Sequence, residues 1–161
     1  MKLEGLNIEW VPVPGAVATF RAEATPEQGI EICRQVKEQG GRLVALWGSD
    51  ARAEGRGFVV HVALVVRSGL VVLALPLAGA SYPDVSAIFP AADRMQRAAF
   101  DLLGIAADGA SDRRKWLRHA AWPADVFPLR KDVADGSEFQ VPGSELQSAT
   151  QNLEPGTLNL E

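Results

Sequence analysis

Apolar residues alternate with polar ones, or form dense runs, in four segments of the first half of the chain. Residues 16–22 alternate enough to predict a strand, and residues 42–47 form a second β-rich segment. Residues 58–66 and 70–77 are Val- and Leu-rich runs joined by a short Arg-Ser-Gly turn, which predicts a hairpin. The polar stretch 48–57 is expected to be a loop. Because both hairpin runs are apolar on both faces, they are typical of central strands, or of a sheet covered by a helix on one face and a partner on the other.

The first helix is predicted to begin just after Thr25. Thr25 can cap it, Pro26 suits the first helical position, and Gln28 completes a capping box. The residues that continue at helical spacing are Ile30, Cys33, Val36 and Lys37. The Gly-Gly pair that follows can adopt the left-handed conformation that ends helices. Cys33 is interpreted as a small buried hydrophobe, because reactive cysteines need an exposed, electropositive setting.

A second helix is predicted over residues 91–103, with Pro90 at or before its first turn and Gly104 just past its end. The residues expected on its buried stripe are Met95, Ala99, Leu102 and Leu103. The residues expected mostly elsewhere are Arg94, Arg97 and Asp101. Asp93 and Arg97 are four residues apart, which predicts a surface ion pair.

The order of elements indicates an α+β fold. Strand, helix and three further strands predict a two-layer domain in which helices cover a mixed four- to five-stranded sheet, with an extended C-terminal arm. We assign residues 1–90 to the sheet domain and residues 91–132 to a helix and docking segment of the same domain. Residues 133–161 are expected to be an acidic tail, either extended or disordered.

Charge is distributed unevenly along the chain. The net charge of −4 and the pI near 5.2 argue against a nucleic-acid-binding domain, which normally has a basic excess. Only residues 91–132 are net basic, with 8 basic and 6 acidic side chains, whereas residues 133–161 hold 5 acidic side chains and no basic one. The longest apolar run, 70–80, is too short to span a bilayer and contains Pro76. No signal-peptide core is recognised near the N-terminus, so we expect a cytoplasmic protein that meets a membrane only through a partner.

Residues that could carry redox chemistry are scarce. The single cysteine cannot supply the thiolates of an iron–sulfur or nickel–iron centre. The glycine pair around Arg56 precedes a strand and does not match a dinucleotide-binding fingerprint, and no P-loop, HExxH or GxSxG motif occurs. His61 lies among valines and is interpreted as a neutral, hydrogen-bonded structural histidine. We therefore expect no catalytic residue, metal ligand or cofactor in this chain.

The densest polar block is residues 112–119, which combines arginines with Trp116 and is followed by Trp122 and Pro123. Arg and Trp are favoured at the buried centres of protein interfaces. Three alternatives remain open: a solvated basic loop, an RNA-binding accessory domain that uses residues 113–118, and a small ligand-binding domain or enzyme with His61 or His119 at its site.

A series of short motifs resembles the C subunit of NADH:quinone oxidoreductase in order and spacing. The motifs are residues 82–92, Arg97, 101–105, Gly109, 112–114, Trp122 and 128–132. The family pattern reads ERE, then D-L-[FY]-G, then G-H-P-D-x-R-R, W and P-L-R-K-D. This chain departs from it at Gln96 and Ala98, where the family has glutamates, and at residues 110–111, where it has His-Pro. In these departures the chain looks more like the domain that precedes the large catalytic subunit in membrane-bound nickel–iron hydrogenases of the formate-hydrogenlyase type.

The resemblance implies a non-catalytic structural subunit in the cytoplasmic arm of a proton-translocating NADH:quinone oxidoreductase or a related hydrogenase complex. It also implies packing against a large subunit, either of the oxidoreductase's D type or nickel–iron-bearing, and against neighbouring cluster-bearing subunits. The residues expected at the partner interface are Arg94, Arg97, Asp101, Arg113, Arg114, Trp116, Arg118, Trp122, Pro128, Arg130, Lys131 and Asp132.

Overall fold

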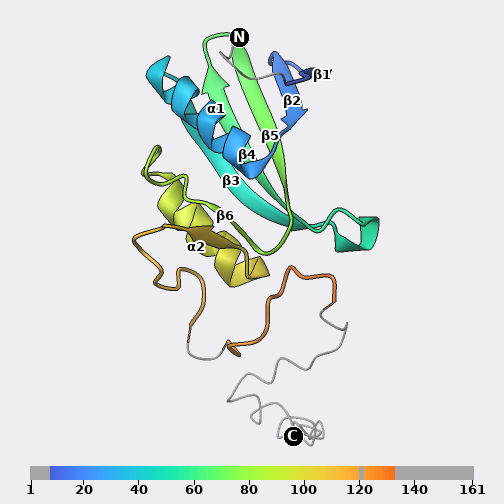
Figure 1. Cartoon of the computed structure of the whole chain (residues 1–161), viewed down its shortest axis with the longest axis vertical. Coiled ribbons are helices and arrows are strands. Elements are labelled where there is room, and N and C mark those ends of the chain that lie inside the picture. Colours follow the sequence, from blue (N-terminus) through green and yellow to red (C-terminus); the bar gives the residue numbers. More distant parts are fainter. Residues whose placement is uncertain (1–7, 120–121, 133–161) are drawn as a thin grey trace, which may run out of the picture.

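The computed structural model describes residues 8–119 and 122–132, and its central element is a five-stranded sheet (Figure 1). The strands follow the order β1-β2-β5-β4-β3, and β2 pairs with β5 in parallel while the other neighbours are antiparallel. Their bounds are β1 Val11–Val13, β2 Thr19–Glu23, β3 Arg42–Asp50, β4 Phe58–Val66 and β5 Gly69–Leu77. The predicted mixed sheet and its hairpin are therefore confirmed.

Two of the predicted segments have different limits in the structure. The first predicted strand begins later, at Thr19, and the short β1 preceding it was not predicted. The predicted loop 48–57 is wrong at its start, because β3 continues to Asp50 in register with the beginning of β4. Only the rest of that stretch is irregular, and it contains a 3₁₀ turn at Arg52–Glu54. Pairing with a neighbouring strand has overridden the polar character of the segment.

Helix α1, Pro26–Glu38, has the predicted start. The Thr25 hydroxyl accepts a hydrogen bond from the Gln28 amide at 3.2 Å, and the Gln28 side chain accepts one from the Thr25 amide at 2.9 Å. Cys33 is fully buried, and desolvation raises the pKa of its thiol to about 12. The thiol is therefore protonated at neutral pH, as expected of a structural cysteine.

Helix α2, Ala92–Leu103, has the predicted length, but its buried face is different from the predicted one. Ala99 and Leu103 are buried as expected, whereas Met95 and Leu102 are only partly buried. The prediction placed Asp101 mostly off the buried stripe, and this is wrong because Asp101 is fully buried, as is nearly all of Gln96. These two polar residues are enclosed by loop segments, which helical periodicity does not reveal.

Both helices lie on one face of the sheet. Helix α1 packs on β4 and β5, and α2 packs beside β3 (Figure 1). Gly48 favours the close approach of α2 to β3, since a Cβ at this position would lie 2.7 Å from the terminal methyl groups of Leu103 and Ile105, which would have to move. Beyond the sheet, β6 (Ser81–Pro83) and β7 (Ala106–Asp108) form a two-stranded parallel sheet that the sequence reading did not foresee.

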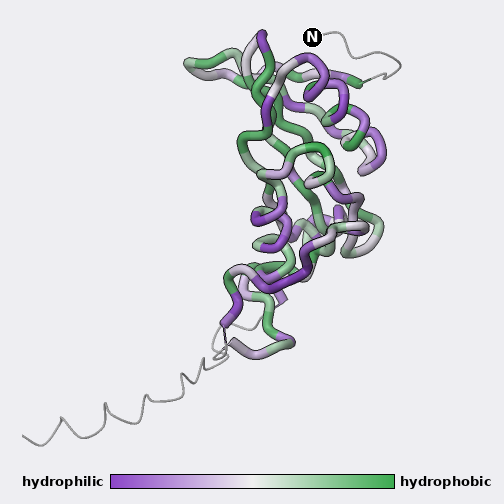
Figure 2. Tube along the Cα trace, turned by 90° about the vertical axis from the view of Figure 1, so that its left-hand side faces the viewer, coloured by the Kyte–Doolittle hydropathy of each residue, from purple (hydrophilic) through white to green (hydrophobic). Residues whose placement is uncertain are grey.

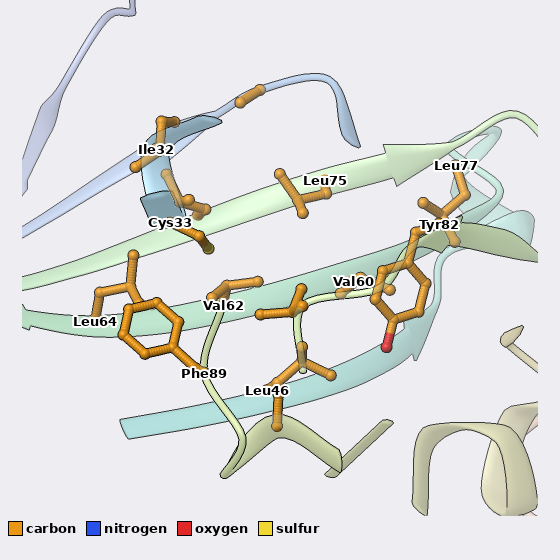
Figure 3. Packing of buried hydrophobic residues seen from close by; sticks show 14 of the residues in the cluster. Ile32, Cys33, Leu46, Val60, Val62, Leu64, Leu75, Leu77, Tyr82 and Phe89 are labelled. Carbon is orange, nitrogen blue, oxygen red and sulfur yellow. The ribbon is translucent and has the colours of Figure 1, made fainter. Parts of the chain in front are cut away.

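The hydrophobic core fills the space between the helices and the sheet. Apolar residues are concentrated on the strands, whereas hydrophilic residues recur along the helices (Figure 2). The core side chains labelled in Figure 3 are Ile32, Cys33, Leu46, Val60, Val62, Leu64, Leu75, Leu77, Tyr82 and Phe89. No helix in the described part of the chain is long and apolar enough to cross a membrane.

Candidate partner interface

Asp101 on α2 fixes the path of residues 109–119, here called the arginine loop. Its Oδ2 accepts hydrogen bonds from the backbone amides of Trp116 and Leu117, both at 2.7 Å, and of Arg118 at 3.2 Å. A carboxylate held by consecutive amides makes charge-assisted bonds, which are stronger than neutral ones. Since Asp101 is fully buried, it acts inside the chain as the anchor of this loop.

Arg97, one helical turn before Asp101, holds the same loop through its carbonyl groups. Its guanidinium donates to the carbonyl of Arg114 at 2.6 Å and to that of Lys115 at 3.3 Å. It also pairs with Asp112 at 3.0 Å, and the predicted ion pair with Asp93 is present at 3.3 Å. One turn of α2 therefore binds both the donors and the acceptors of the loop backbone.

The guanidinium groups that remain exposed lie on the outer side of this arrangement. Arg114 forks onto Asp112, and its hydrogen bonds hold the pKa of that carboxyl well below its usual range. Arg94 stacks on the ring of Trp116, with the guanidinium carbon 4.8 Å from the ring centroid. Within the described residues, Arg94, Arg113 and Lys115 form no ion pair.

Arg118 organises the beginning of residues 122–132, here called the C-terminal segment. Its guanidinium donates to the carbonyls of Ala124 at 2.6 Å and Val126 at 2.7 Å. It also stacks against Trp122 and Phe127, with its guanidinium carbon 5.6 Å and 4.8 Å from the ring centroids. The Trp122 indole donates to the carbonyl of Val126 at 2.9 Å, so Arg118, Trp122 and Phe127 form a compact cluster with the backbone between them.

Arg130 docks the C-terminal segment onto the end of α2. Its Nε donates to the carbonyl of Leu103 at 2.7 Å, and its guanidinium stacks on Phe127 and Phe58. Gly104, with φ +74°, ends the helix directly beneath it. A Cβ at Gly104 would lie 3.0 Å from the Phe127 ring and would meet Arg130, so both the conformation and the space favour glycine here.

The last described residues are tied to the end of β3. The buried Asp50 carboxylate accepts from the Lys131 amide at 2.9 Å and from the Arg52 guanidinium at 2.7 Å. Hydrogen bonds from Arg52 hold the pKa of Asp50 well below its usual range. Arg52 in turn pairs with Asp132 at 3.0 Å. Asp50 therefore joins the end of β3 to a segment 81 positions later in the sequence.

Gln96 has a structural role that the sequence reading did not assign. Its side-chain oxygen accepts from the Val85 amide at 2.7 Å, and its nitrogen donates to the Asp84 carboxylate at 2.7 Å. An amide suits both partners, whereas a glutamate here would face another carboxylate. The departure from the family's acidic residue is therefore matched by this environment.

The twelve predicted interface residues thus fall into two groups. Those that lie partly or wholly inside the fold and hold the two segments are Arg97, Asp101, Arg118, Trp122 and Arg130. Those that are exposed are Arg94, Arg113, Arg114, Trp116, Pro128, Lys131 and Asp132. A role at an interface stays a prediction, and for the buried Asp101 it can only be indirect. The part of the chain from α2 onward also exposes three large apolar side chains that the prediction did not include, Phe100, Leu117 and Leu129.

We define the docking surface as the exposed side chains around the arginine loop. They are Arg94, Phe100, Arg113, Arg114, Trp116 and Leu117. Phe100, Trp116 and Leu117 are 40%, 44% and 42% exposed, and exposed apolar patches mark interaction sites when their residues are contiguous. An apolar centre flanked by guanidinium groups is typical of protein interfaces.

The histidines form no catalytic arrangement with the residues that the structure describes. His61 hydrogen-bonds to the Ser49 hydroxyl at 2.9 Å and stacks on Trp47, which agrees with a structural histidine. Burial, and then the charge of Arg56, lower the pKa of His61. It lines a shallow depression that also contains Glu23, but this carboxylate pairs with Arg56. His119 is exposed, and the described residues contain no cluster of three potential metal ligands.

Comparison with known families gives one match over most of the chain. Residues 22–138 match the family model described as "Respiratory-chain NADH dehydrogenase, 30 Kd subunit". Hydrogenase-4 component G of Escherichia coli is 33% identical in an alignment 138 residues long, and the match covers 76% of this chain and 24% of that protein. Formate hydrogenlyase subunit 5 of E. coli is 28% identical in an alignment 116 residues long, and the match covers 69% of this chain and 20% of that protein. The chain thus spans about a fifth to a quarter of these relatives.

A shorter relative and two solved structures extend the comparison. The C subunit of NADH-quinone oxidoreductase of Caulobacter is 35% identical in an alignment 94 residues long, and the match covers 56% of this chain and 43% of that protein. The Nqo5 trypsin-resistant fragment matches at a TM-score of 0.54 and 18% identity, covering 64% of this chain and 89% of its own. A chain of the archaeal membrane-bound sulfane sulfur reductase matches at 0.63 and 17%, covering 94% and 88%. At these identities the structures establish the shared fold.

Proposed function

The chain belongs to the family of the 30-kDa subunit of respiratory-chain NADH dehydrogenase, and from this premise we propose that it is a non-catalytic docking subunit. Its place would be the cytoplasmic arm of an NADH:quinone oxidoreductase or a related membrane-bound hydrogenase, packed against the large catalytic subunit. In this role it holds no cofactor and reaches the membrane only through the complex.

The observation that carries the proposal is the way the two segments after α2 are held. Asp101, Arg97, Arg130 and Asp50 fasten them to the domain by hydrogen bonds, and those of Asp101, Arg130 and Asp50 are partly buried. The anchors leave the apolar side chains of the arginine loop exposed next to exposed cationic ones. These contacts hold the surface in one conformation before a partner binds, and this lowers the entropic cost of binding.

The relatives support a large subunit as the neighbour. One of them, from Rhodopseudomonas palustris, carries the joint name of the C/D subunit of NADH-quinone oxidoreductase, and this chain covers 17% of it. The E. coli relatives are likewise several times longer than the region they share with this chain. The E. coli matches, which cover 69% and 76% of this chain, carry hydrogenase or hydrogenlyase names, and this favours a hydrogenase-type complex as the parent.

Affinity purification of the full chain from the membrane fraction of its native cells tests the proposal. We expect a large catalytic subunit to co-purify in equal amount, as a lasting interface of at least ~1,200 Å² would require. Recovery of the chain alone would refute the docking role. Identification of the largest companion by mass spectrometry distinguishes a hydrogenase from a quinone reductase.

Two exposed tryptophans provide a matched pair of variants. Trp116 on the docking surface and Trp47 on the helix-free face of the sheet are 44% and 43% exposed. We expect Trp116→Ala to weaken co-purification and Trp47→Ala to leave it unchanged. The reverse result would place the interface on the open face of the sheet.

A further inference from the structure

A pocket of about 150 Å³ opens between α2, β7 and the arginine loop. Its apolar lining includes Phe100, Ala107 and Ala110, and its polar lining consists of Gln96, Arg97, Asp108, Asp112, Arg113 and Arg114. An apolar cavity of roughly 150 Å³ is large enough to hold a benzene ring. One aromatic or leucine side chain would therefore fill the apolar part of this pocket.

Three arginines against two carboxylates, Asp108 and Asp112, leave the pocket lining net positive, which favours an acidic occupant. Arg113 forms no ion pair in the described part of the chain, and Arg114 shares its one carboxylate, that of Asp112, with Arg97, which also pairs with Asp93. The side chain of Arg114 is 82% exposed. A carboxylate from a partner can therefore reach this guanidinium group and replace Asp112 without any rearrangement of the fold. Planar guanidinium groups bind carboxylates through paired hydrogen bonds.

The surroundings of the pocket favour a protein segment over a free small molecule. Trp116 stacks on Arg97, which lines the pocket, and Leu117 follows Trp116 in the chain. Both side chains are exposed, so the apolar surface continues beyond the pocket. An isolated small molecule would leave this surface uncovered, whereas a longer segment would bury it.

We infer that this pocket receives one aromatic or leucine side chain from an acidic segment of the large subunit, whose neighbouring carboxylate pairs with Arg113 or Arg114. The inference rests on the proposed function and adds the chemistry of the partner segment. It makes the pocket the centre of the docking surface, with the arginines setting the register of the bound segment.

A peptide titration tests the pocket without the large subunit. The full chain is mixed with acetyl-Glu-Glu-Phe-Glu-Glu amide, and the methyl signals of Ala107 and Ala110 are followed by NMR. We expect both signals to shift, and a peptide with Ser in place of Phe to bind about ten-fold more weakly, since an apolar ring is no longer buried. Absence of shifts at millimolar peptide, or equal binding of both peptides, overturns the inference.

Two variants and one control test whether the peptide binds in the pocket. Ala110→Phe fills the pocket and Arg113→Glu reverses a charge, and each should weaken peptide binding by about ten-fold. Arg113 is exposed, so its variant is expected to fold even if the filled pocket disturbs the loop. Arg67→Glu makes the same charge reversal in the exposed turn between β4 and β5, away from α2 (Figure 1), and should bind like wild type.

Co-purification with the large subunit separates this inference from the proposed function. If the wild-type chain and both pocket variants co-purify equally well, the pocket inference fails while the docking role stands. If the wild-type chain does not co-purify, the docking role fails. The peptide titration then still shows whether the pocket binds an aromatic side chain within an acidic segment.

Discussion

Replacing Asp101 with asparagine should release the arginine loop while leaving the sheet domain folded. The carboxylate accepts three backbone hydrogen bonds through Oδ2, and its Oδ1 is buried without a partner among the described residues. Asparagine keeps the shape and one acceptor oxygen, but it removes the charge and puts an NH₂ group at the buried position of Oδ1. A hydrogen bond to a charged group contributes about 1.5–3 kcal/mol against about 0.5–1.5 for a neutral one, so three weakened bonds cost roughly 3 kcal/mol.

Amide hydrogen exchange measures this loss directly. The amides of Trp116, Leu117 and Arg118 are the donors, so their exchange reports local opening of the loop. A cost of roughly 3 kcal/mol corresponds to exchange about a hundred-fold faster in Asp101→Asn than in wild type. Amides of β4 and β5 should keep their protection, because their hydrogen bonds lie within the sheet.

A second carboxylate serves as the control for charge alone. Asp125 is exposed, and its side chain forms no ion pair with any described residue. Asp125→Asn should therefore leave exchange of the loop amides unchanged. If Asp101→Asn also left these three amides at wild-type rates, the anchoring role of the buried carboxylate would be refuted.

Three other substitutions or treatments test separate parts of the account. Gln96→Glu should destabilise the fold by about 2–3 kcal/mol at pH 7, because two adjacent carboxylates cannot both ionise. Burial alone would raise the pKa of Asp84, but hydrogen bonds, first among them the one from Gln96, lower it overall. In the variant, repulsion between the introduced glutamate and the Asp84 carboxylate raises the pKa of the pair in the folded state above its value in the unfolded chain. The variant therefore keeps its stability below the unfolded-state pKa and loses it as pH rises. The denaturant midpoints of variant and wild type should converge toward pH 4. An equal difference between these midpoints at pH 4 and pH 7 would contradict this. Gly104→Ala should cost about 1–3 kcal/mol in urea unfolding, since a left-handed residue gains a Cβ against Phe127, and an unchanged midpoint would show that the helix end relaxes freely. Cys33 should react with a thiol reagent at pH 8 only after denaturation, because its buried thiol has a pKa of about 12, and rapid labelling of the native chain would disprove this.

Periodicity and capping signals are sufficient to predict four of the five strands of the main sheet and both helices. The Thr25 capping box and the β4–β5 hairpin depend on neighbours in sequence, so the sequence contains the information needed to recognise them. The parallel pair β6 and β7 depends on residues about 25 positions apart and has no local signature. Short strands of this kind form because tertiary contacts hold them in place.

The polar side chains of α2 illustrate what helical periodicity cannot show. Arg97 and Asp101 were singled out from the motif, but as residues facing a partner. Their actual contacts are with a loop some 15 residues later in the chain. The sequence does not reveal that the Asp101 carboxylate is buried, because its hydrogen-bond donors are backbone amides, which a loop of any sequence could provide. The contact becomes visible only in the folded structure.

Hydrogen exchange of the chain, free and bound to its large subunit, tests the docking role most directly. The account predicts that binding slows exchange in the arginine loop and around Phe100, while amides of β3 and β4 exchange as in the free chain. Protection confined to the strands that carry Trp47 and His61 would contradict it, because the partner would then cover the open face of the sheet.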